Sequence, residues 1–452
     1  MRRQILKFVI FLGDVVFLFL SLLIVLYVRY GAAYVRVEFA DHLGPFSLIF
    51  AVWVTVFYIT DLYNFSVPLN HKYFLYAMAV NLGLAVGFFY AFPGQEISPK
   101  TNLALVVLCF GVFFYVWRFI FNRSLDTLGI KKPLIIVGSD THALELAQKI
   151  KENSRLGYRL AAIVRDNGTE LPAWVKPARV RVLDRVTDIH DLLQHDRVHS
   201  IIVSDRKLAA VYDDLYQLIP YQINFFQLTT FWEAFDESIP IYAAQATWFL
   251  ERFSHGPNRA YRILKRILDI GTVIVTLPVT GVLALITALL VRLTSRGPIF
   301  YIQTRLGQSE RPFTIVKFRS MVVNAEQNGA QWAGENDPRV TPFGRFMRKT
   351  RLDEIPQLIN VLRGDMSVVG PRPERPEFVQ ELSRTIPHYH LRHLVKPGLT
   401  GWAQIKYRYG ASAEDAAKKL MYDLYYVKNV SVVLDVKIAL KTVLVIFKKA
   451  GQ

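Results

Sequence analysis

The sequence predicts a membrane protein built from three parts: an N-terminal four-helix transmembrane bundle, a central α/β domain, and a C-terminal domain held at the membrane. Three observations predict this arrangement. Hydrophobic residues make up 52% of the 452 residues, four apolar segments fill the first quarter of the chain, and short strand-like and helix-like stretches alternate after Pro133. Because soluble chains of this length rarely contain so much apolar sequence, part of the chain is expected to contact lipid. The predicted parts are residues 1–130, 131–251 and 252–452.

The formal net charge of +17, from 54 basic and 37 acidic residues, suits anionic partners. No zinc-finger spacing and no basic-zipper pattern accompanies this charge. We therefore expect phosphorylated substrates or the negative face of a lipid bilayer, and no nucleic acid. The single cysteine, Cys109, excludes disulfides and cysteine-based metal sites within the chain. The first apolar stretch lacks a small-residue cleavage site, so no cleavable signal peptide is expected.

Each of the four apolar segments is close to the ~20 residues with which a helix spans a hydrocarbon core. They cover roughly residues 5–28, 46–63, 73–92 and 103–121. Basic residues lie before or at the start of the first segment and at the end of or after the fourth, so both ends of the bundle are expected in the cytoplasm: these are Arg2, Arg3, Lys7, Arg118, Arg123, Lys131 and Lys132. Asp14 lies inside the first segment, either as a functional group or as a carboxyl satisfied within the bundle.

The central part alternates strands and helices in the pattern of a doubly wound, Rossmann-like α/β domain. Strands are predicted at residues 134–137, 159–164, 200–203 and 223–228, and helices at 141–150, 188–193 and 208–218. The turn after the first strand contains only Gly138 of the three glycines in a dinucleotide fingerprint. We therefore favour a scaffold or regulatory module, with nucleotide binding as the alternative.

A fifth apolar stretch, residues 267–291, is predicted to form a re-entrant hairpin over residues 266–292. Pro278 lies in its middle, where it should bend or break a helix. Arg259, Arg262, Lys265 and Arg266 precede the stretch and Arg292, Arg296 and Arg305 follow it, so charge favours neither direction of crossing. The alternative is a spanning helix. The tail, residues 431–449, carries Lys437, Lys441 and Lys448 at helical spacing, which predicts an interfacial amphipathic helix with its lysines toward lipid headgroups.

A basic run leads directly into an acidic pair at a predicted helix start: Arg348, Lys349 and Arg351, then Asp353 and Glu354, then Pro356. The basic side chains would hold a diphosphate, and the carboxylates could bind Mg²⁺ together with phosphate oxygens. One carboxylate could also attack phosphorus and form an acyl phosphate. The structural alternative is that the acidic residues favour the helix dipole and the basic residues are solvated.

Further motifs surround this pair, at residues 317–321, 337–345, 364–374, 397–404 and 422–426. Taken singly, Gly370–Pro373 could be a rigid turn and residues 397–404 a loop around a packed Trp402. Together they resemble one family, the bacterial sugar transferases, or monotopic polyprenyl-phosphate phosphoglycosyl transferases. The resemblance runs from about Tyr261 to the C-terminus. It includes Lys265, Arg266 and Asp269 before the proline-broken hairpin.

The resemblance implies a C-terminal α/β catalytic domain in a long, exopolysaccharide-initiating member at the bacterial inner membrane, with its catalytic domain on the cytoplasmic face. It implies transfer of hexose-1-phosphate from a UDP-sugar to undecaprenyl phosphate, with Mg²⁺ as cofactor. Asp353 matches the nucleophile that expels UMP, and Glu354 its Mg²⁺-binding partner. The other implied site residues are Arg348, Lys317 and Arg319 as active-site cations, and Arg351, Pro371, Arg372 and Pro373 as substrate-binding residues. A homodimer is a candidate assembly.

Two other hypotheses fit the sequence less well. A membrane-anchored nucleotide sensor would need a complete glycine fingerprint and a degraded acidic pair, and the sequence has the reverse. A membrane-fused NAD-dependent sugar epimerase would need a Tyr-X-X-X-Lys pair after the central strands, and none lies at a useful position. For the donor, UDP-glucose is the first choice, with UDP-galactose and the UDP-N-acetylhexosamines left open.

Overall fold

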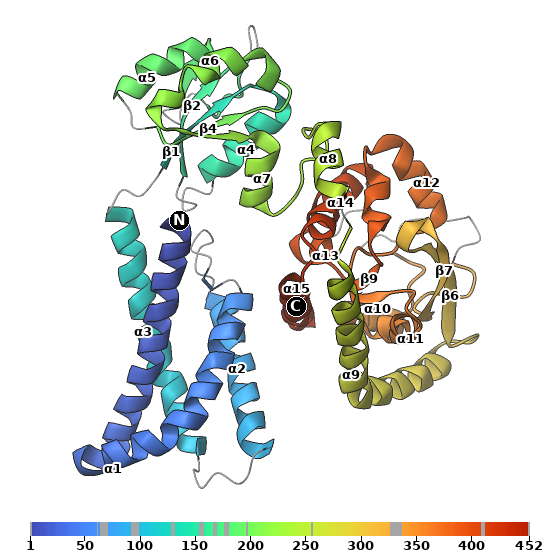
Figure 1. Ribbon diagram of the computed structural model, residues 1–452. Helices are drawn as coiled ribbons and strands as arrows, with labels where there is room; N and C mark the ends of the chain where they lie inside the picture. Colours follow the sequence, from blue (N-terminus) through green and yellow to red (C-terminus); the bar gives the residue numbers. More distant parts are fainter. Residues whose placement is uncertain are drawn as a thin grey trace. The chain divides into compact units, whose positions relative to one another are not determined.

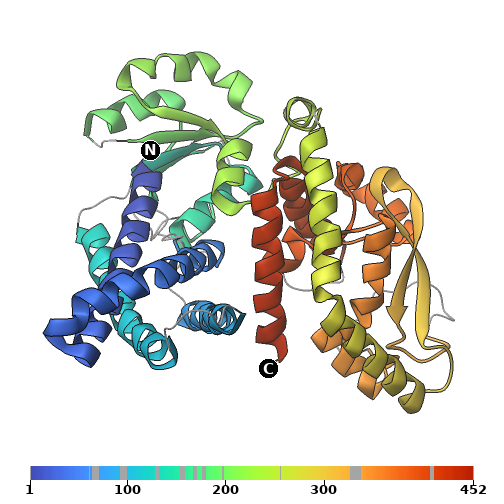
Figure 2. The ribbon, with the colours of Figure 1, turned by 60° about the horizontal axis from the view of Figure 1, so that its bottom comes forward.

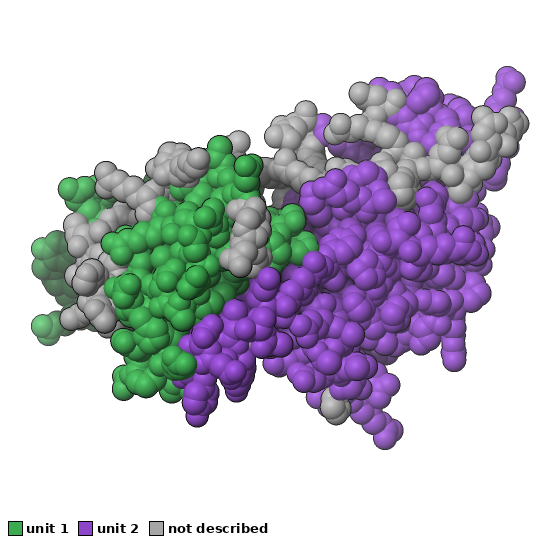
Figure 3. Space-filling model, turned by 90° about the horizontal axis from the view of Figure 1, so that it is seen from above, with its two compact units in different colours: residues 1–201, 217–224 green, residues 202–216, 225–452 purple. Residues whose placement is uncertain are grey.

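The computed structural model describes residues 2–60, 62–63, 71–91, 99–127, 132–152, 158–165, 170–175, 180–195, 198–254, 256–325, 337–407 and 412–450. Lys131 and the side chains of Arg2, Arg3, Lys7 and Lys448 lie outside the described part. The chain forms two compact units, coloured separately in Figure 3. One contains residues 1–201 and 217–224, and the other contains residues 202–216 and 225–452.

The first unit begins with the long apolar helices α1 (Arg2–Ile59), α2 (His71–Ala91) and α3 (Pro99–Thr127) (Figure 1). Helix α1 is two helices joined at Gly31, whose φ of 76° is accessible mainly to glycine. By length and apolar composition, Phe8–Ile59 in α1 and Thr101–Phe121 in α3 suffice to cross a membrane, whereas the apolar part of α2, Phe74–Phe89, is shorter. The prediction of several long apolar helices near the N-terminus is confirmed.

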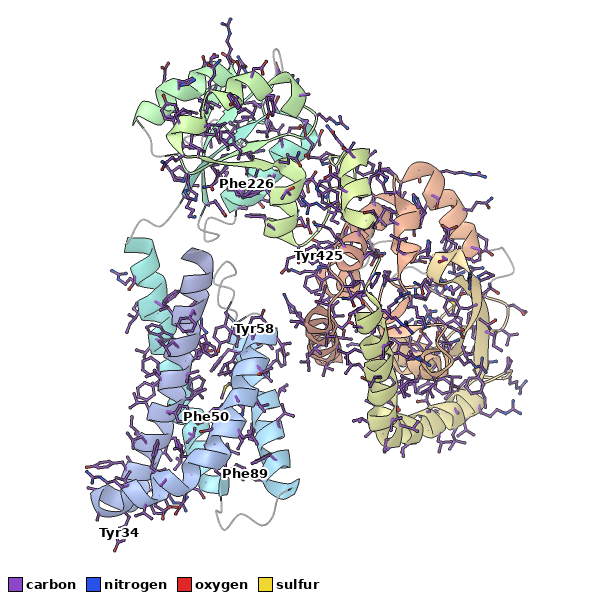
Figure 4. All side chains as sticks on the ribbon, in the orientation of Figure 1. Tyr34, Phe50, Tyr58, Phe89, Phe226 and Tyr425 are labelled. Carbon is purple, nitrogen blue, oxygen red and sulfur yellow. The ribbon has the colours of Figure 1, made fainter. Side chains whose placement is uncertain are left out.

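Aromatic side chains fill the space between these helices. Phe50, labelled in Figure 4, is buried and packs edge-on against Phe46, which also contacts Phe89. A buried ion pair joins the first helix to the last, because Arg118 donates to Asp14 at 2.7 Å. Asp14 is therefore paired within the bundle, the second of the two predicted alternatives, and this pairing offsets part of the cost of burying its charge.

The central sheet has the strand order β3-β2-β1-β4-β5, and β1 pairs in parallel with β2, as β2 does with β3. The strands are β1 (Lys132–Val137), β2 (Tyr158–Val164), β3 (Arg181–Leu183), β4 (Ser200–Val203) and β5 (Asn224–Gln227). The helices are α4 (Thr141–Glu152), α5 (Ile189–His195), α6 (Tyr212–Tyr216) and α7 (Leu228–Asp236). The predicted parallel α/β domain is confirmed. The predicted helix at 208–218 is instead two shorter pieces, η4 (Leu208–Ala210) and α6, and η5 (Ile219–Tyr221) follows them.

The rest of the second unit surrounds two small sheets, the antiparallel hairpin β6–β7 and the parallel pair β8–β9. Its strands are β6 (Phe300–Leu306), β7 (Pro312–Phe318), β8 (Ser367–Val369) and β9 (Gly398–Thr400). Its helices are α8 (Ala246–Phe253), α9 (Arg259–Thr294), α10 (Pro342–Thr350), η7 (Leu352–Gln357), α11 (Leu358–Arg363), α12 (Pro376–Thr385), η8 (Tyr389–Leu394), α13 (Trp402–Lys406), α14 (Ala413–Lys428) and α15 (Val432–Ala450). A side chain at Gly398 would lie 2.1 Å from the backbone of Gly370, so the close approach after β8 requires glycine.

Helix α9 contains Pro278, and Figure 1 shows it as two arms that point in different directions. Its first arm is fixed to the domain at three places. Lys265 pairs with Asp435 of α15 at 2.9 Å, and Arg266 donates to the carbonyls of residues 361 and 362 at the end of α11. Asp269 accepts from the Ser367 hydroxyl and from the next backbone amide. Beyond this base, most apolar side chains of α9 are exposed, with Val275 at 79%.

Helix α15 lies beside the first arm of α9 (Figure 2). The prediction that its lysines face lipid headgroups is wrong for Lys437 and Lys441. Their ammonium groups lie over the indole ring of Trp402, at 5.1 and 5.6 Å from its centroid, and Lys437 is 3.5 Å from Glu237. The aromatic face and the carboxylate attract both cations toward the protein.

The core of the C-terminal domain begins before residue 252. Ile239, Ile241, Trp248 and Phe249 are buried in one cluster with side chains from α12, η8 and α14. In addition, the Trp402 indole donates to the Glu237 carbonyl at 2.9 Å. Residues 237–249 are therefore part of the C-terminal core.

Candidate active site

The acidic pair lies at a sharp turn between two helices. Helix α10 is capped by Thr341, whose hydroxyl accepts from the Gly344 amide, and it ends at Thr350. Arg351 then adopts a left-handed conformation with φ 62°, which starts η7 in a new direction. Asp353 and Glu354 occupy the first turn of η7, as the sequence predicts.

Three cations surround the Glu354 carboxylate. Arg372 donates to Glu354 Oε1 at 2.5 Å, Arg351 lies 3.3 Å from the same oxygen, and the Lys317 ammonium lies 3.6 Å away. Burial alone would raise the pKa of Glu354, but Arg372, Lys317 and Arg351 together lower that pKa well below its usual range. Glu354 is therefore ionised at any physiological pH.

Asp353 has the opposite environment. Its side chain is 7% exposed, and its Oδ1 atom has no hydrogen-bond partner among the described residues. Burial, and then the neighbouring charge of Glu354, raise the pKa of Asp353 to about 6. Two adjacent carboxyls with separated pKa values commonly perform different tasks. Near pH 7 Asp353 is mostly an ionised carboxylate with one unpartnered oxygen, which is the state that a nucleophile requires.

Lys317, near the end of β7, is a half-buried charged group of the site, with its side chain 17% exposed. Burial, and then the nearby Arg372 guanidinium, lower the pKa of Lys317 to about 8. This side chain is thus charged at neutral pH and can lose its proton in the mildly alkaline range.

The loop at residues 371–373 is held by its backbone. The Pro371 carbonyl accepts from the Gly398 amide at 2.9 Å, and the Pro373 carbonyl accepts from Arg305 at 3.3 Å. Between them, the Arg372 carbonyl accepts from Arg392 at 2.9 Å. The prolines thus define a rigid support from which the Arg372 side chain reaches Glu354.

The structure brings together Lys317, Arg351, Asp353, Glu354 and Arg372, and it places two other predicted residues in different contacts. Arg348 donates to the Ser320 hydroxyl at 2.9 Å. Arg319 is buried and donates to the carbonyl and hydroxyl of Ser295, in the turn after α9.

Sequence reasoning missed Arg392, which holds the backbone of Arg372. The motif at residues 422–426 contained its partner, because Asp423 accepts from Arg392 at 2.8 Å. A buried acidic residue in an otherwise apolar and aromatic motif was the available signal.

The acidic pair suits Mg²⁺. The pair offers two carboxylates, and no cluster of three or more histidine, cysteine or acidic side chains is present in the described residues. Mg²⁺ typically takes one or two carboxylates and completes its shell with water and substrate phosphates. The unpartnered Asp353 Oδ1 beside the ionised Glu354 matches that requirement.

Residues 260–449 match the family model described as bacterial sugar transferase. The chain is 47% identical over 195 residues to the UDP-N-acetylgalactosamine-undecaprenyl-phosphate N-acetylgalactosaminephosphotransferase of Aeromonas hydrophila, covering 43% of this chain and 46% of that one. It is 45% identical to the UDP-glucose:undecaprenyl-phosphate glucose-1-phosphate transferase of Escherichia coli (strain K12), over 40% of each chain. A protein of the same name in Klebsiella pneumoniae is 31% identical over 69% of this chain and 67% of its own. The chain thus spans less than half of the first two relatives.

Proposed function

The chain belongs to the bacterial sugar transferase family, and from that premise we propose that it moves hexose-1-phosphate from a UDP-sugar to undecaprenyl phosphate. UMP is the released product, and the reaction is the first membrane step of a surface polysaccharide. The observation that carries the proposal is the buried Asp353 carboxylate with its unpartnered oxygen, beside a Glu354 ringed by cations. The names of the relatives support the substrate classes.

The proposed reaction has two displacements at phosphorus. In the first, an Asp353 oxygen attacks the phosphorus that carries the sugar, the bond to the bridging oxygen breaks, and UMP leaves with that oxygen. In the second, an oxygen of undecaprenyl phosphate attacks the same phosphorus and the Asp353 carboxylate leaves. The bond between the sugar and its phosphate oxygen is never broken, so the anomeric configuration is retained.

The cations have a defined task in this scheme. Lys317, Arg351 and Arg372 are held together by Glu354 and would turn toward the diphosphate of the donor when it binds. Asp353 and Glu354 would hold Mg²⁺, which when bound would neutralise charge on the phosphate oxygens. Arg348 is proposed as a further phosphate contact.

The donor is proposed to be UDP-glucose, and UDP-N-acetylgalactosamine is the second candidate because of the Aeromonas relative. The test is UMP release by the purified protein in lipid nanodiscs, with undecaprenyl phosphate and each of several UDP-sugars. UDP-glucose should give the highest kcat/KM, and removal of Mg²⁺ by a chelator should stop release until Mg²⁺ is restored. A higher kcat/KM with an N-acetylhexosamine donor would reassign the sugar. No UMP from any donor would refute the proposed function.

The two pKa shifts predict a bell-shaped pH dependence of kcat/KM. Activity should fall as the pH drops below about 6, where Asp353 gains a proton, and again as it rises above about 8, where Lys317 loses one. Lys317→Arg keeps a positive charge throughout, so its alkaline limb should disappear while its acid limb stays. UMP release measured across this range tests both limbs, and an unchanged alkaline limb in Lys317→Arg would assign it to another group.

We also propose that α9 enters and leaves the membrane on the cytoplasmic face, as a hairpin bent at Pro278. The exposed apolar side chains beyond its base and the bend in Figure 1 support this topology. It keeps Asp353 on the side where nucleotide-sugars are made. In this arrangement the protein is a multi-pass protein of the inner membrane.

Cysteine labelling should distinguish the hairpin from a spanning helix. In a Cys109→Ala background, single cysteines at the exposed positions Arg262 and Arg296 should both resist a membrane-impermeant thiol reagent in intact cells and react after permeabilisation. A single cysteine in place of Tyr34, which is exposed just after the Gly31 kink (Figure 4), should react in intact cells and is the positive control. Labelling at only one of positions 262 and 296 in intact cells would establish a spanning helix.

A further inference from the structure

A buried polar cluster contacts the backbone of the loop that carries Arg372. Arg392 is its centre. It donates to the Tyr389 hydroxyl at 2.6 Å, to Asp423 at 2.8 Å and to the Arg372 carbonyl at 2.9 Å. Arg392 and its two side-chain partners are buried, with Tyr389 and Asp423 2% exposed and Arg392 6%.

We infer that Arg392, oriented by Asp423 and Tyr389, is a positioning residue that sets where Arg372 presents its guanidinium to the UDP-sugar. The inference rests on the proposed function and adds a residue that does not itself touch the donor. Arg392 acts only through the Arg372 backbone, while the Arg372 side chain extends to the acidic pair.

The cost of burial supports a positioning task. A buried guanidinium is tolerated only when its hydrogen-bond donors and its charge are satisfied, and apolar residues of similar volume often stabilise a core equally well. The Arg392 guanidinium also lies over the Tyr389 ring, 5.1 Å from its centroid, which adds a further contact that holds it in place. Arginine is suited to this position because its planar group can bond three acceptors in different directions.

The arrangement leaves the Arg372 side chain as the adjustable part of the loop. The flanking carbonyls of Pro371 and Pro373 are bonded to Gly398 and Arg305, so the backbone is tied on both sides of Arg372. Its side chain is 34% exposed and contacts Glu354. The Arg372 side chain can therefore exchange Glu354 for a diphosphate oxygen without any movement of the main chain. If Arg392 did not hold the Arg372 backbone, the guanidinium would be misplaced by a fraction of an ångström, which is enough to weaken binding.

The test is a double-mutant cycle between Arg392→Lys and Arg372→Ala, measured as KM and kcat for UMP release from the UDP-sugar. Lysine keeps the charge, but its three donors share one nitrogen atom and cannot reproduce the planar spread of the guanidinium over the three acceptors. Arg392→Lys should raise KM about tenfold with a smaller change in kcat. In the Arg372→Ala background the same substitution should change KM by less than about twofold, because the group that it positions is gone. Tyr389→Phe, which removes one hydroxyl and keeps the ring, should raise KM in the same direction by a smaller factor.

A matched control separates positioning from general stability. Leu382→Ala removes a buried side chain from the cluster that contains Tyr389 and should lower the melting temperature while leaving KM unchanged. Independent, multiplying effects of Arg392→Lys and Arg372→Ala on KM would overturn the inference, and so would an equal rise of KM in Leu382→Ala. An Arg372→Ala variant with unaltered KM would overturn the inference too, because Arg372 would then not bind the donor. An inactive wild-type protein would instead refute the proposed function.

Discussion

Asp353→Asn is expected to lower UMP release by about 10⁴-fold or more, because a neutral amide oxygen is a poor nucleophile and cannot leave as a carboxylate in the second displacement. The substitution preserves the size of the side chain, and it removes the negative charge that lies next to Glu354. It should therefore leave the fold intact and its melting temperature close to that of the wild type.

Two measurements make this expectation specific. Wild-type protein incubated with the UDP-sugar in the absence of undecaprenyl phosphate should gain the mass of one hexose phosphate on the peptide that contains Asp353, and Asp353→Asn should gain none. Asp365→Asn is the control, since this half-buried carboxyl lies on the same stretch of chain and has no contact with the acidic pair in the described structure. Substantial turnover by Asp353→Asn at matched expression would remove Asp353 from the mechanism.

A protein that starts at residue 252 is expected to be far less stable than one that starts at residue 225. The shorter form lacks Ile239, Ile241, Trp248 and Phe249, which are buried against α12, η8 and α14. The loss of each such buried side chain lowers the free energy of unfolding by about 2–5 kcal/mol, and the free energy of unfolding of a typical domain is only about 5–15 kcal/mol. The shorter form should therefore aggregate, or elute as more than one species in detergent. The longer form should keep activity and stay with membranes through α9.

Size-exclusion chromatography and thermal unfolding of the two truncated proteins check this prediction. The full-length Trp248→Ala variant provides a parallel measurement without truncation, and its melting temperature should fall by several degrees. Equal stability of the two truncations would show that residues 225–251 contribute little to the catalytic core.

Local patterns predicted much of the fold and failed where distant residues meet. Hydropathy identified the N-terminal helices, and alternation of short strands and helices identified the parallel sheet. The contact of Trp402 with Glu237 joins positions 165 residues apart, and no periodicity in either segment marks it. For the same reason, Lys437 and Lys441 were predicted to face lipid, because their spacing defines a helix face and does not show what covers that face.

In the candidate site, too, the residues within motifs were predicted and a residue defined by distant contacts was not. Motifs placed Asp353, Glu354 and Arg372 in one site, and the structure brings them together. Arg392 lies between histidine and leucine residues in a stretch that resembles basic surface, and only its tertiary contacts with Tyr389 and Asp423 show that it is buried. A sequence records the type of a charged residue, whereas its burial depends on partners elsewhere in the chain.

The base of α9, the proposed membrane anchor, is fixed to the domain that carries Asp353, so the distance between the anchor and Asp353 is fixed as well. Lys265, Arg266 and Asp269 bond the anchor to α15, α11 and β8, and α11 follows directly on the turn that carries Asp353. The base of α9 and the proposed nucleophile, Asp353, therefore belong to one packed domain. If the bent anchor lies in lipid, its depth determines the distance between Asp353 and the layer of lipid phosphate groups. The turnover rate should then depend on the thickness of the bilayer. Nanodiscs of lipids with longer or shorter acyl chains should change turnover without altering any group that touches a substrate.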